Sequence, residues 1–415
     1  MTERNGGRRR LLLRDLAQLA TPAGDDAPLR GPSLGVVDVV ENAYVLCEDG
    51  RIAACGPMRR LARIDGEVDE VDGRGLCAVP GLVDCHTHAC FAGDRVDEFE
   101  LRARGADYEE LHASGGGIIA TVRATRSAGE AGLAEAVRRH REAMRRCGTT
   151  TFEAKSGYGL DRETELASLR AIRAAGGLPT WLGAHAVPPE FADGDAYLDF
   201  ALAEVLPEAA RLAAAADVFV EEGAFSVEQA RRYLEACRAA GLELRLHGDQ
   251  FTEQGAVTLA AELGARSVDH LEATGPEGVQ ALASSDVAAV LLPASALFLG
   301  RSMPPARALV DAGATVALAT DFNPGSSFCE SLPIVTSLAA TQLHLTPPEA
   351  LSACTVNAAH VLGRGDELGR IAPGYVADVV LLDAPDWRYL AYHLGAPLVE
   401  TVIEGGAVTW SARNA

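Results

Sequence analysis

The chain has 415 residues, of which 48% are hydrophobic and 23% are charged, a composition typical of folded globular proteins rather than disordered ones. With 37 Lys+Arg against 58 Asp+Glu the formal net charge is −21, which argues against nucleic acids and anionic membrane surfaces as partners. No stretch reaches the roughly 20 apolar residues of a membrane span. With nucleic acids and membranes disfavoured, we expect a small molecule as the partner.

The two ends of the chain have a similar texture. Near the N-terminus, short strands separated by Gly, Pro and acidic turns are expected at 11–20, 43–56 and 74–79. Residues 22–34 have the composition of a loop or insertion. Near the C-terminus, strands are expected at 376–382, 399–403 and 407–410. We interpret residues 1–79 and 363–415 as the two parts of one small, β-sandwich-like domain.

Between residues 80 and 362 short apolar runs alternate with helical stretches. Eight strands are expected, at 82–86, 149–154, 179–184, 217–221, 242–247, 266–270, 287–292 and 315–320. Helical apolar spacing, or a loop leading into it, follows each strand, as at 163–174, 227–240 and 255–263. Eight such units over roughly 280 residues predict an α/β fold, a (β/α)8 TIM barrel whose chemistry lies at the C-terminal ends of its strands.

Histidines gather at those strand ends. The first strand ends in His86 and His88, and residues two apart on an extended segment point the same way, so both imidazoles can bind one cation. His247 ends the fifth strand, His270 ends the sixth, and Asp321 follows the eighth. Imidazoles with one carboxylate suit zinc or iron. Any one histidine could be an ordinary core residue, but the set favours a metal site.

Lys155 and His185 each allow two interpretations. Lys155 follows the second strand and could be a carbamylated bridge for a second metal, or an ion-pair partner of Glu153 or another carboxylate. We favour the ion pair because three histidines and Asp321 already fill a mononuclear site. His185, after the third strand, is either a buried structural histidine or a substrate contact on the same rim.

Arg95 lies on the loop after the first strand. With Asp94, Asp97 and Glu98 beside it, it could belong to a surface ion-pair network. Alternatively, it supplies the local positive charge that an anionic substrate needs in a chain of net charge −21, holding a carboxylate bidentately.

These residues resemble a known family. The stretch Pro80–His88 together with His247, His270 and Asp321 is similar to the metal-dependent amidohydrolase superfamily. Within it, the chain resembles the imidazolonepropionase family. The motifs that carry this resemblance run in order across nearly the whole chain and are Phe91–Arg95, Ser114–Ile118, Lys155–Leu160, Leu182–Glu190 and Ala319–Ser326.

The resemblance implies hydrolysis of the ring C–N bond of 4-imidazolone-5-propanoate to N-formimino-L-glutamate. It implies one zinc or iron held by His86, His88, His247 and Asp321, and a homodimer. The substrate and product contacts that it implies are Arg95, Tyr158, His185, Gln250, Asn323, Gly325 and Ser326. As a mechanism, we expect Asp321 to accept a proton from the attacking water and His270 to stabilise the oxyanion.

Residue 250 departs from some members of the family. It is Gln here, whereas they have Glu, and an amide cannot act as a general base. The main alternative function is an aminohydrolase that deaminates a purine, a pyrimidine or a related cyclic amidine. Because that chemistry typically uses a Glu at this position, Gln250 counts against it. A non-catalytic barrel scaffold is a lesser alternative, since scaffolds commonly lose metal ligands that are all present here.

The cysteines bear on the cellular compartment. Nine of them are scattered without a C-x-x-C pair, and no secretory leader is recognisable. Reduced thiols in a cytoplasmic protein are therefore expected.

Overall fold

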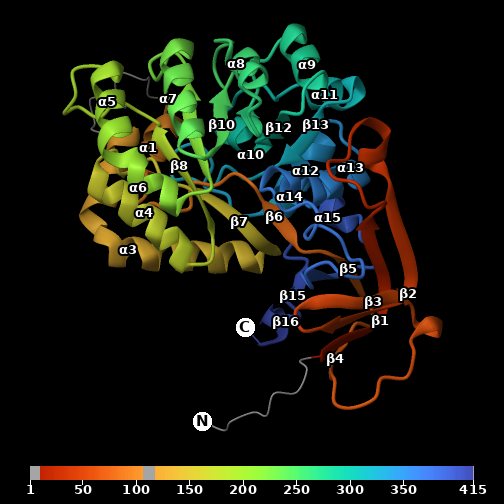
Figure 1. Ribbon diagram of the computed structural model, residues 1–415. Helices are drawn as coiled ribbons and strands as arrows, with labels where there is room; N and C mark the ends of the chain where they lie inside the picture. Colours follow the sequence, from red (N-terminus) through yellow and green to blue (C-terminus); the bar gives the residue numbers. More distant parts are fainter. Residues whose placement is uncertain (1–9, 106–116, 415) are drawn as a thin grey trace. The chain divides into compact units, whose positions relative to one another are not determined.

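The computed structural model describes residues 10–105 and 117–414 (Figure 1). Ser114–Gly116 of the motif Ser114–Ile118 lies outside these described residues. The chain divides into two compact units. One comprises Met1–Asp84, Met144–Thr151 and Ser331–Ala415, and the other comprises Cys85–Ala143 and Phe152–Glu330.

One sheet contains the eight strands expected between residues 80 and 362. Its spatial order is that of the sequence, from β6 to β13. The strands are β6 (Leu82–Asp84), β7 (Thr149–Lys155), β8 (Leu178–Ala184), β9 (Ala215–Val220), β10 (Glu243–Gly248), β11 (Ser267–His270), β12 (Ala288–Leu291) and β13 (Thr315–Leu318). From β7 to β13, every neighbouring pair is parallel. The predicted (β/α)8 barrel is confirmed.

The segments that follow the first and last strands of this sheet are joined by backbone hydrogen bonds. Asp321 N donates to His86 O at 3.1 Å, and His88 N donates to Phe322 O at 2.9 Å. These bonds link the two edges of the sheet at the carboxyl ends of its strands, where the predicted site residues lie.

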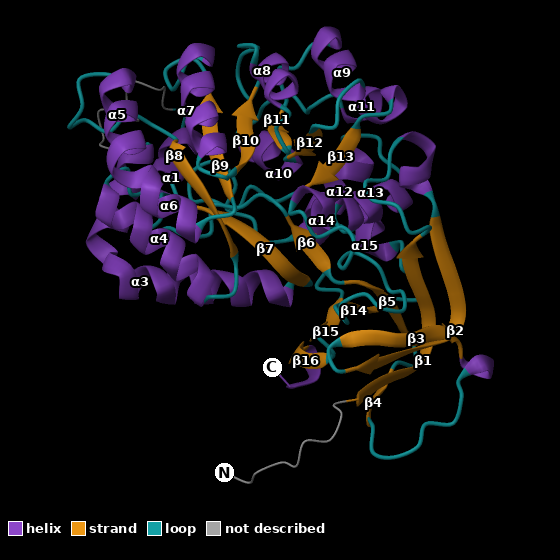
Figure 2. Cartoon of the chain, in the orientation of Figure 1, coloured by secondary structure: helices purple, strands orange, loops and turns teal. Residues whose placement is uncertain are grey.

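Helices follow the strands of this sheet and lie outside it (Figure 2). They are α1 (Val96–Ala103), α3 (Ile118–Arg146), α4 (Arg162–Ala174), α5 (Gly194–Phe200), α6 (Leu206–Leu212), α7 (Val227–Ala239), α8 (Ala256–Leu263), α9 (Pro276–Ala283), α10 (Pro293–Phe298) and α11 (Ala306–Ala312), with a π-turn η3 (Ala201–Val205) before α6. Helix α4 begins where the Asp161 carboxylate accepts a hydrogen bond from Thr164 N at 2.7 Å. A capping box between Ser226 and Gln229 starts α7.

A second sheet is built from both ends of the chain, as expected. Its order is β16-β15-β14-β5-β1-β2-β3, and β4 also pairs with β1. The strands are β1 (Arg10–Pro22), β2 (Val37–Glu48), β3 (Arg51–Pro57), β4 (Asp69–Asp72), β5 (Leu76–Pro80), β14 (Val379–Asp383), β15 (Val399–Glu404) and β16 (Ala407–Ser411). Leu13, Leu16, Val379 and Ile403 belong to its buried core. The sheet is mixed, because β1 pairs antiparallel with β2 but parallel with β5.

Further helices belong to the unit that contains the chain ends. They are α12 (Leu332–Thr341), α13 (Pro347–Ala353), α14 (Val356–Val361) and α15 (Tyr389–Tyr392), with the short turns η1 (Gly31–Gly35), η2 (Met58–Arg60) and η4 (Ala412–Asn414). Among the described residues, no helix combines the length and apolar character needed to cross a membrane.

Candidate active site

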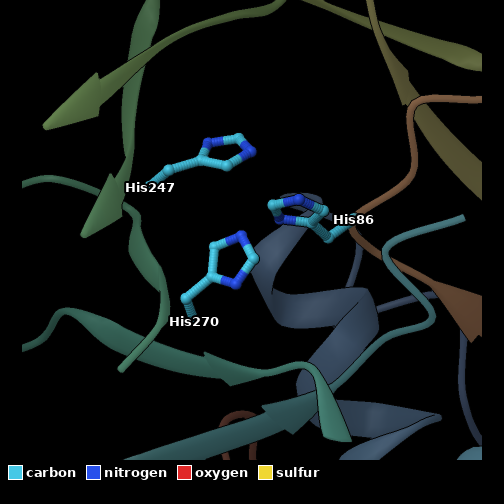
Figure 3. A group of neighbouring side chains, drawn as sticks. All are labelled: His86, His247 and His270. Atoms are coloured by element: carbon cyan, nitrogen blue, oxygen red, sulfur yellow. The ribbon is translucent and has the colours of Figure 1, made fainter. Parts of the chain in front are cut away.

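Five predicted side chains meet at the carboxyl edge of the barrel. His86 and His88 follow β6, His247 lies near the end of β10, His270 ends β11, and Asp321 follows β13. Because parallel strands end on the same edge, residues far apart in sequence are brought together there. Figure 3 shows the rings of His86, His247 and His270 turned toward a common space from separate segments.

The atoms facing this space are metal-binding in character. His88 Nε2 lies 3.2 Å from His247 Nε2. Asp321 Oδ1 lies 3.4 Å from His88 Nε2 and 3.5 Å from His86 Nε2. His86 Nε2 is buried and, among the described residues, has no hydrogen-bond partner. His86, His247 and His270 form a second group whose ligand atoms lie within 4.8 Å of one another. Such a convergence of imidazole nitrogens and a carboxylate fits a divalent cation.

Two buried aspartates orient two of these imidazoles. Asp269 Oδ2 lies 2.5 Å from His86 Nδ1, and Asp217 Oδ1 lies 3.0 Å from His247 Nδ1. A carboxylate at Nδ1 favours the tautomer protonated there, which leaves Nε2 with a lone pair for a metal. Burial, and then the Lys155 charge, lower the pKa of His86 well below its ordinary value, so this ring is neutral. The sequence offered one signal for Asp217, an acidic residue inside an otherwise apolar strand.

Lys155 is fully buried beneath this group. Its Nζ lies 2.8 Å from Glu153 Oε1 and 2.8 Å from Asp217 Oδ2. Burial alone would lower the pKa of Lys155, but Asp217 and Glu153 outweigh it and raise the pKa above its ordinary value. Lys155 is therefore an ammonium, and its interpretation as an ion-pair partner is confirmed.

A cavity of about 720 Å³ opens in front of the histidines. The predicted site residues that line it are His88, Arg95, Tyr158, His185, His247, Gln250, His270, Asp321, Asn323, Gly325 and Ser326. His86 is fully buried beside them. All the residues predicted from the sequence to bind metal, substrate or product are thus brought to one place.

Arg95 faces this cavity while it is held by an ion pair. Its Nε and Nη2 donate to the two oxygens of Glu98, at 2.8 and 2.6 Å. Glu98 Oε2 also accepts a hydrogen bond from Gly117 N at 2.8 Å. A Cβ at Gly325 would collide with Arg95 Nη1, so a larger residue there would displace the guanidinium. The ion-pair interpretation of Arg95 is confirmed, and Glu98 already occupies one bidentate edge of the guanidinium, that of Nε and Nη2. The contact of Arg95 with a substrate stays a prediction.

The loop after Asp321 fixes the aspartate itself. Asn323 Nδ2 donates to Asp321 O at 2.6 Å, and Asn323 Oδ1 accepts from the backbone N of Gly325 and Ser326 at 2.8 and 2.7 Å. Ser326 Oγ donates to Asp321 Oδ2 at 3.2 Å. Asp321 has a φ of 54°, a left-handed conformation that Asp tolerates better than most residues. The loop thus holds Oδ1 toward the histidines and Oδ2 toward Ser326.

His185 and Tyr158 form the opposite wall. His185 Nδ1 lies 3.0 Å from Gly157 O, a carbonyl that can only accept, so Nδ1 carries the proton and Nε2 is an acceptor. Burial, followed by the neighbouring His247, lowers the pKa of His185 to about 3. The rings of His185 and Tyr158 are 5.3 Å apart, and burial raises the pKa of the Tyr158 phenol.

Glu165, on α4, holds the loop that carries Tyr158. Its side chain is almost fully buried, and Oε1 accepts hydrogen bonds from the backbone N of Gly157, Gly159 and Leu160 at 3.0, 2.8 and 3.0 Å. A Cβ at Gly159 would lie 2.7 Å from Glu165 N, so no larger residue fits there. Sequence reasoning missed Glu165, because nothing local indicates that a helical carboxylate reaches back to this loop.

His270 has a carboxylate partner that the sequence analysis did not identify. Glu272 Oε1 lies 3.5 Å from His270 Nδ1. Burial opposes the charged form of His270, but Glu272 outweighs it and raises the pKa above its ordinary value. Gln250, which is 8% exposed, also lines the cavity.

The outer wall of the cavity adds residues that the motifs did not indicate. Arg102 Nη2 donates to Gly325 O at 2.9 Å, and its guanidinium lies 5.4 Å from the ring centre of Phe298. Arg301 lies over the ring of Phe251, at 5.1 Å. Two cations besides Arg95 therefore face the cavity of a strongly acidic chain, which suits an anionic ligand.

Comparisons with known proteins agree with this geometry. The sequence model of the Amidohydrolase family matches residues 77–408. An imidazolonepropionase of Rubrobacter xylanophilus is 61% identical over 96% of this chain and 98% of its own length. Imidazolonepropionases of Chloroflexus aggregans and Geobacillus kaustophilus are 45% and 44% identical, each over 96% of this chain and 98% of its own length.

Solved structures share the fold. An adenosine deaminase from Xanthomonas campestris with bound zinc has a TM-score of 0.71 at 20% identity and covers 97% of this chain and 93% of its own. The A. niger ochratoxinase has a TM-score of 0.67 at 18% identity, over 97% of this chain and 96% of its own. At such identities the likeness concerns the architecture alone.

Proposed function

Because the chain belongs to the amidohydrolase family, and within it to the imidazolonepropionases, we propose that it hydrolyses the ring C–N bond of 4-imidazolone-5-propanoate to N-formimino-L-glutamate. The observation that carries the proposal is the convergence of His86, His88, His247 and Asp321 beside the cavity, with the Nε2 of His86 left without a hydrogen-bond partner among the described residues.

These four side chains would hold one zinc or iron cation. When bound, the cation supplies Lewis acidity, which lowers the pKa of a water toward neutrality and so provides a hydroxide nucleophile. Asp217 and Asp269 keep two of the imidazoles in the tautomer that such binding requires.

Asp321 is the proposed acceptor of the proton that the attacking water loses. Its Oδ2 is held by the Ser326 hydroxyl at 3.2 Å, while Oδ1 faces His86 and His88. A carboxylate with its two oxygens held in different directions can contact a ligand group on one side and accept a proton on the other. After the ring opens, Asp321 or His270 returns this proton to the departing nitrogen.

His270 is the proposed donor to the tetrahedral oxyanion. Its Nδ1 faces Glu272, which stabilises a protonated ring, so Nε2 is the nitrogen left to donate toward the substrate. Glu272 lies beside the same ring nitrogen of His270 as Asp269 does of His86, at 3.5 Å instead of 2.5 Å.

The remaining residues that line the cavity are proposed to orient the substrate. His185 presents a neutral Nε2 that accepts a hydrogen bond, which suits a ring N–H rather than the carbonyl oxygen. Arg95 and Tyr158 provide donors for the propionate, and Arg95 offers its Nη1 because Nε and Nη2 are engaged by Glu98. Gln250 orients substrate or water without taking a proton.

The function is tested by incubating the purified enzyme with the imidazolone, generated in situ by the preceding step of histidine degradation. Absorbance of the imidazolone should be lost and N-formimino-L-glutamate should appear. The rival deamination would release ammonia, whereas opening of the imidazolone ring does not. Ammonia release from a purine, pyrimidine or cyclic amidine, without loss of the imidazolone, would refute the proposal.

The proposal extends to the assembly and its metal. We expect a homodimer in the cytoplasm with one zinc or iron per chain, supported by the family resemblance and the fit of the four ligands. Metal analysis identifies the ion, and a protein that neither contains nor responds to a metal would instead be a scaffold.

A further inference from the structure

Lys155 is the only lysine in this chain. All the other residues among the 37 Lys+Arg are arginines. The single exception is also one of the most buried charged groups, with 0% of its surface exposed. In a chain whose other basic side chains are guanidinium groups, this buried position holds an ammonium.

The surroundings of Lys155 match the shape of an ammonium. Its Nζ lies 2.8 Å from Glu153 Oε1, 2.8 Å from Asp217 Oδ2 and 3.8 Å from Asp269 Oδ2. An ammonium has three donors around one nitrogen, whereas a guanidinium is planar and spreads its donors along a fork. Three carboxylates that converge on one point are therefore suited to lysine.

Two of these three carboxylates each hold a histidine of the candidate metal centre. Asp217 Oδ1 lies 3.0 Å from His247 Nδ1, and its Oδ2 pairs with Lys155 Nζ. Asp269 Oδ2 lies between His86 Nδ1, at 2.5 Å, and Lys155. Lys155 thus connects the orienting partners of two imidazoles that come from different parts of the barrel.

Building on the metal site of the proposed function, we propose that Lys155 is a positioning residue that fixes His86 and His247 together through Asp269 and Asp217. Among the described residues that line the cavity, Lys155 is absent. Without the ammonium, two buried carboxylates would repel each other, and the imidazoles that depend on them would lose a fixed direction.

The test measures metal affinity by competition with a chelator. Lys155→Met keeps the reach of the side chain but removes its charge, and it should weaken metal affinity about 10–100-fold. Lys155→Arg keeps the positive charge but carries it on a planar guanidinium, and it should also weaken metal affinity. The matched control is Arg370→Met, which removes a 2%-exposed cation whose Nη2 donates to Asp26 O in the other unit, and should leave affinity unchanged.

Two further readouts separate positioning from a structural role. Metal should raise the melting temperature of the Lys155 variants less than that of the parent, because stabilisation by a ligand follows its affinity for the folded state. Asp217→Asn should weaken metal affinity about tenfold in the parent but much less in the Lys155→Met background, because both changes break the same connection.

The proposal is overturned if both Lys155 variants bind metal as tightly as the parent, or if the metal-free and metal-loaded forms lose equal stability. If Lys155→Met does not fold, Lys155→Arg and the metal-dependent melting shift decide the matter. A parent that binds no metal would refute the proposed function itself, which distinguishes the two failures.

Discussion

Replacing Glu165 should reveal how much the loop behind Tyr158 depends on one buried carboxylate. Three backbone N–H groups point at Glu165 Oε1 within 3.0 Å, in a residue that is 1% exposed. Each buried N–H left without an acceptor costs about 1–3 kcal/mol. Glu165→Ala leaves all three N–H groups without an acceptor, so we expect the free energy of unfolding to fall by about 4 kcal/mol or more.

Glu165→Gln should cost far less. The amide oxygen can occupy the position of Oε1 and accept from the same three groups, which then lose only the added strength of a charged acceptor. Burial raises the pKa of Glu165, so the charge itself is unfavourable there and its removal offsets part of the loss. We therefore expect a cost of about 1–2 kcal/mol for Gln.

Urea denaturation of the metal-loaded enzyme measures both values. The control is Glu349→Ala in the other unit, where the carboxylate accepts from Thr346 N at 2.7 Å in a capping box, and where about 1 kcal/mol is expected. The reasoning is refuted if Glu165→Gln and Glu165→Ala lower the free energy of unfolding equally. It is also refuted if Glu165→Ala lowers it no more than the control does, because the three N–H groups would then not need Glu165 as their acceptor.

Three further predictions concern the site. Asp321→Asn should lower kcat at least about a thousandfold, since it removes a ligand charge and the proton acceptor; near-normal turnover with the metal retained would contradict this role. Arg95→Ala should raise KM more than it lowers kcat, and an unchanged kcat/KM would remove Arg95 from the substrate site. The pKa of His185 is about 3 when folded and 6.5 ordinarily, so only the unfolded chain gains a proton as the pH falls below 6.5. Stability should fall there by up to about 1.4 kcal/mol per pH unit, and His185→Asn should flatten this slope; equal slopes would show that His185 does not carry it.

The barrel strands and the place of the site could be predicted because both depend on local pattern. Strands buried on both faces leave continuous apolar runs, and every expected strand between residues 80 and 362 is present within a few residues. Parallel strands then end at the same edge, which brings His86, His247 and Asp321 to one rim of the barrel. In contrast, β4 (Asp69–Asp72) was not predicted, because three of its four residues are acidic and its pairing with β1 supplies what its sequence lacks.

The partners of the site residues could not be predicted from the sequence, because each pairing depends on side chains from different elements. Asp217 comes from β9 and orients a histidine on β10, and Glu165 reaches from α4 to the loop before it. The pairing of Arg95 with Glu98 is the exception. It spans three residues at the start of α1, and the acidic neighbours of Arg95 already made it one of two interpretations.

The backbone bonds between the segments after β6 and β13 would give the proposed metal centre a second role. His86 and His88 follow the first strand of the barrel and Asp321 follows the last, next to the bonds Asp321 N–His86 O and His88 N–Phe322 O. A cation held by these three side chains would be a reversible cross-link between the beginning and the end of the barrel's chain. Its binding energy would then contribute to closure of the barrel, so that release of the ion and opening of the sheet at this seam would be one coupled event.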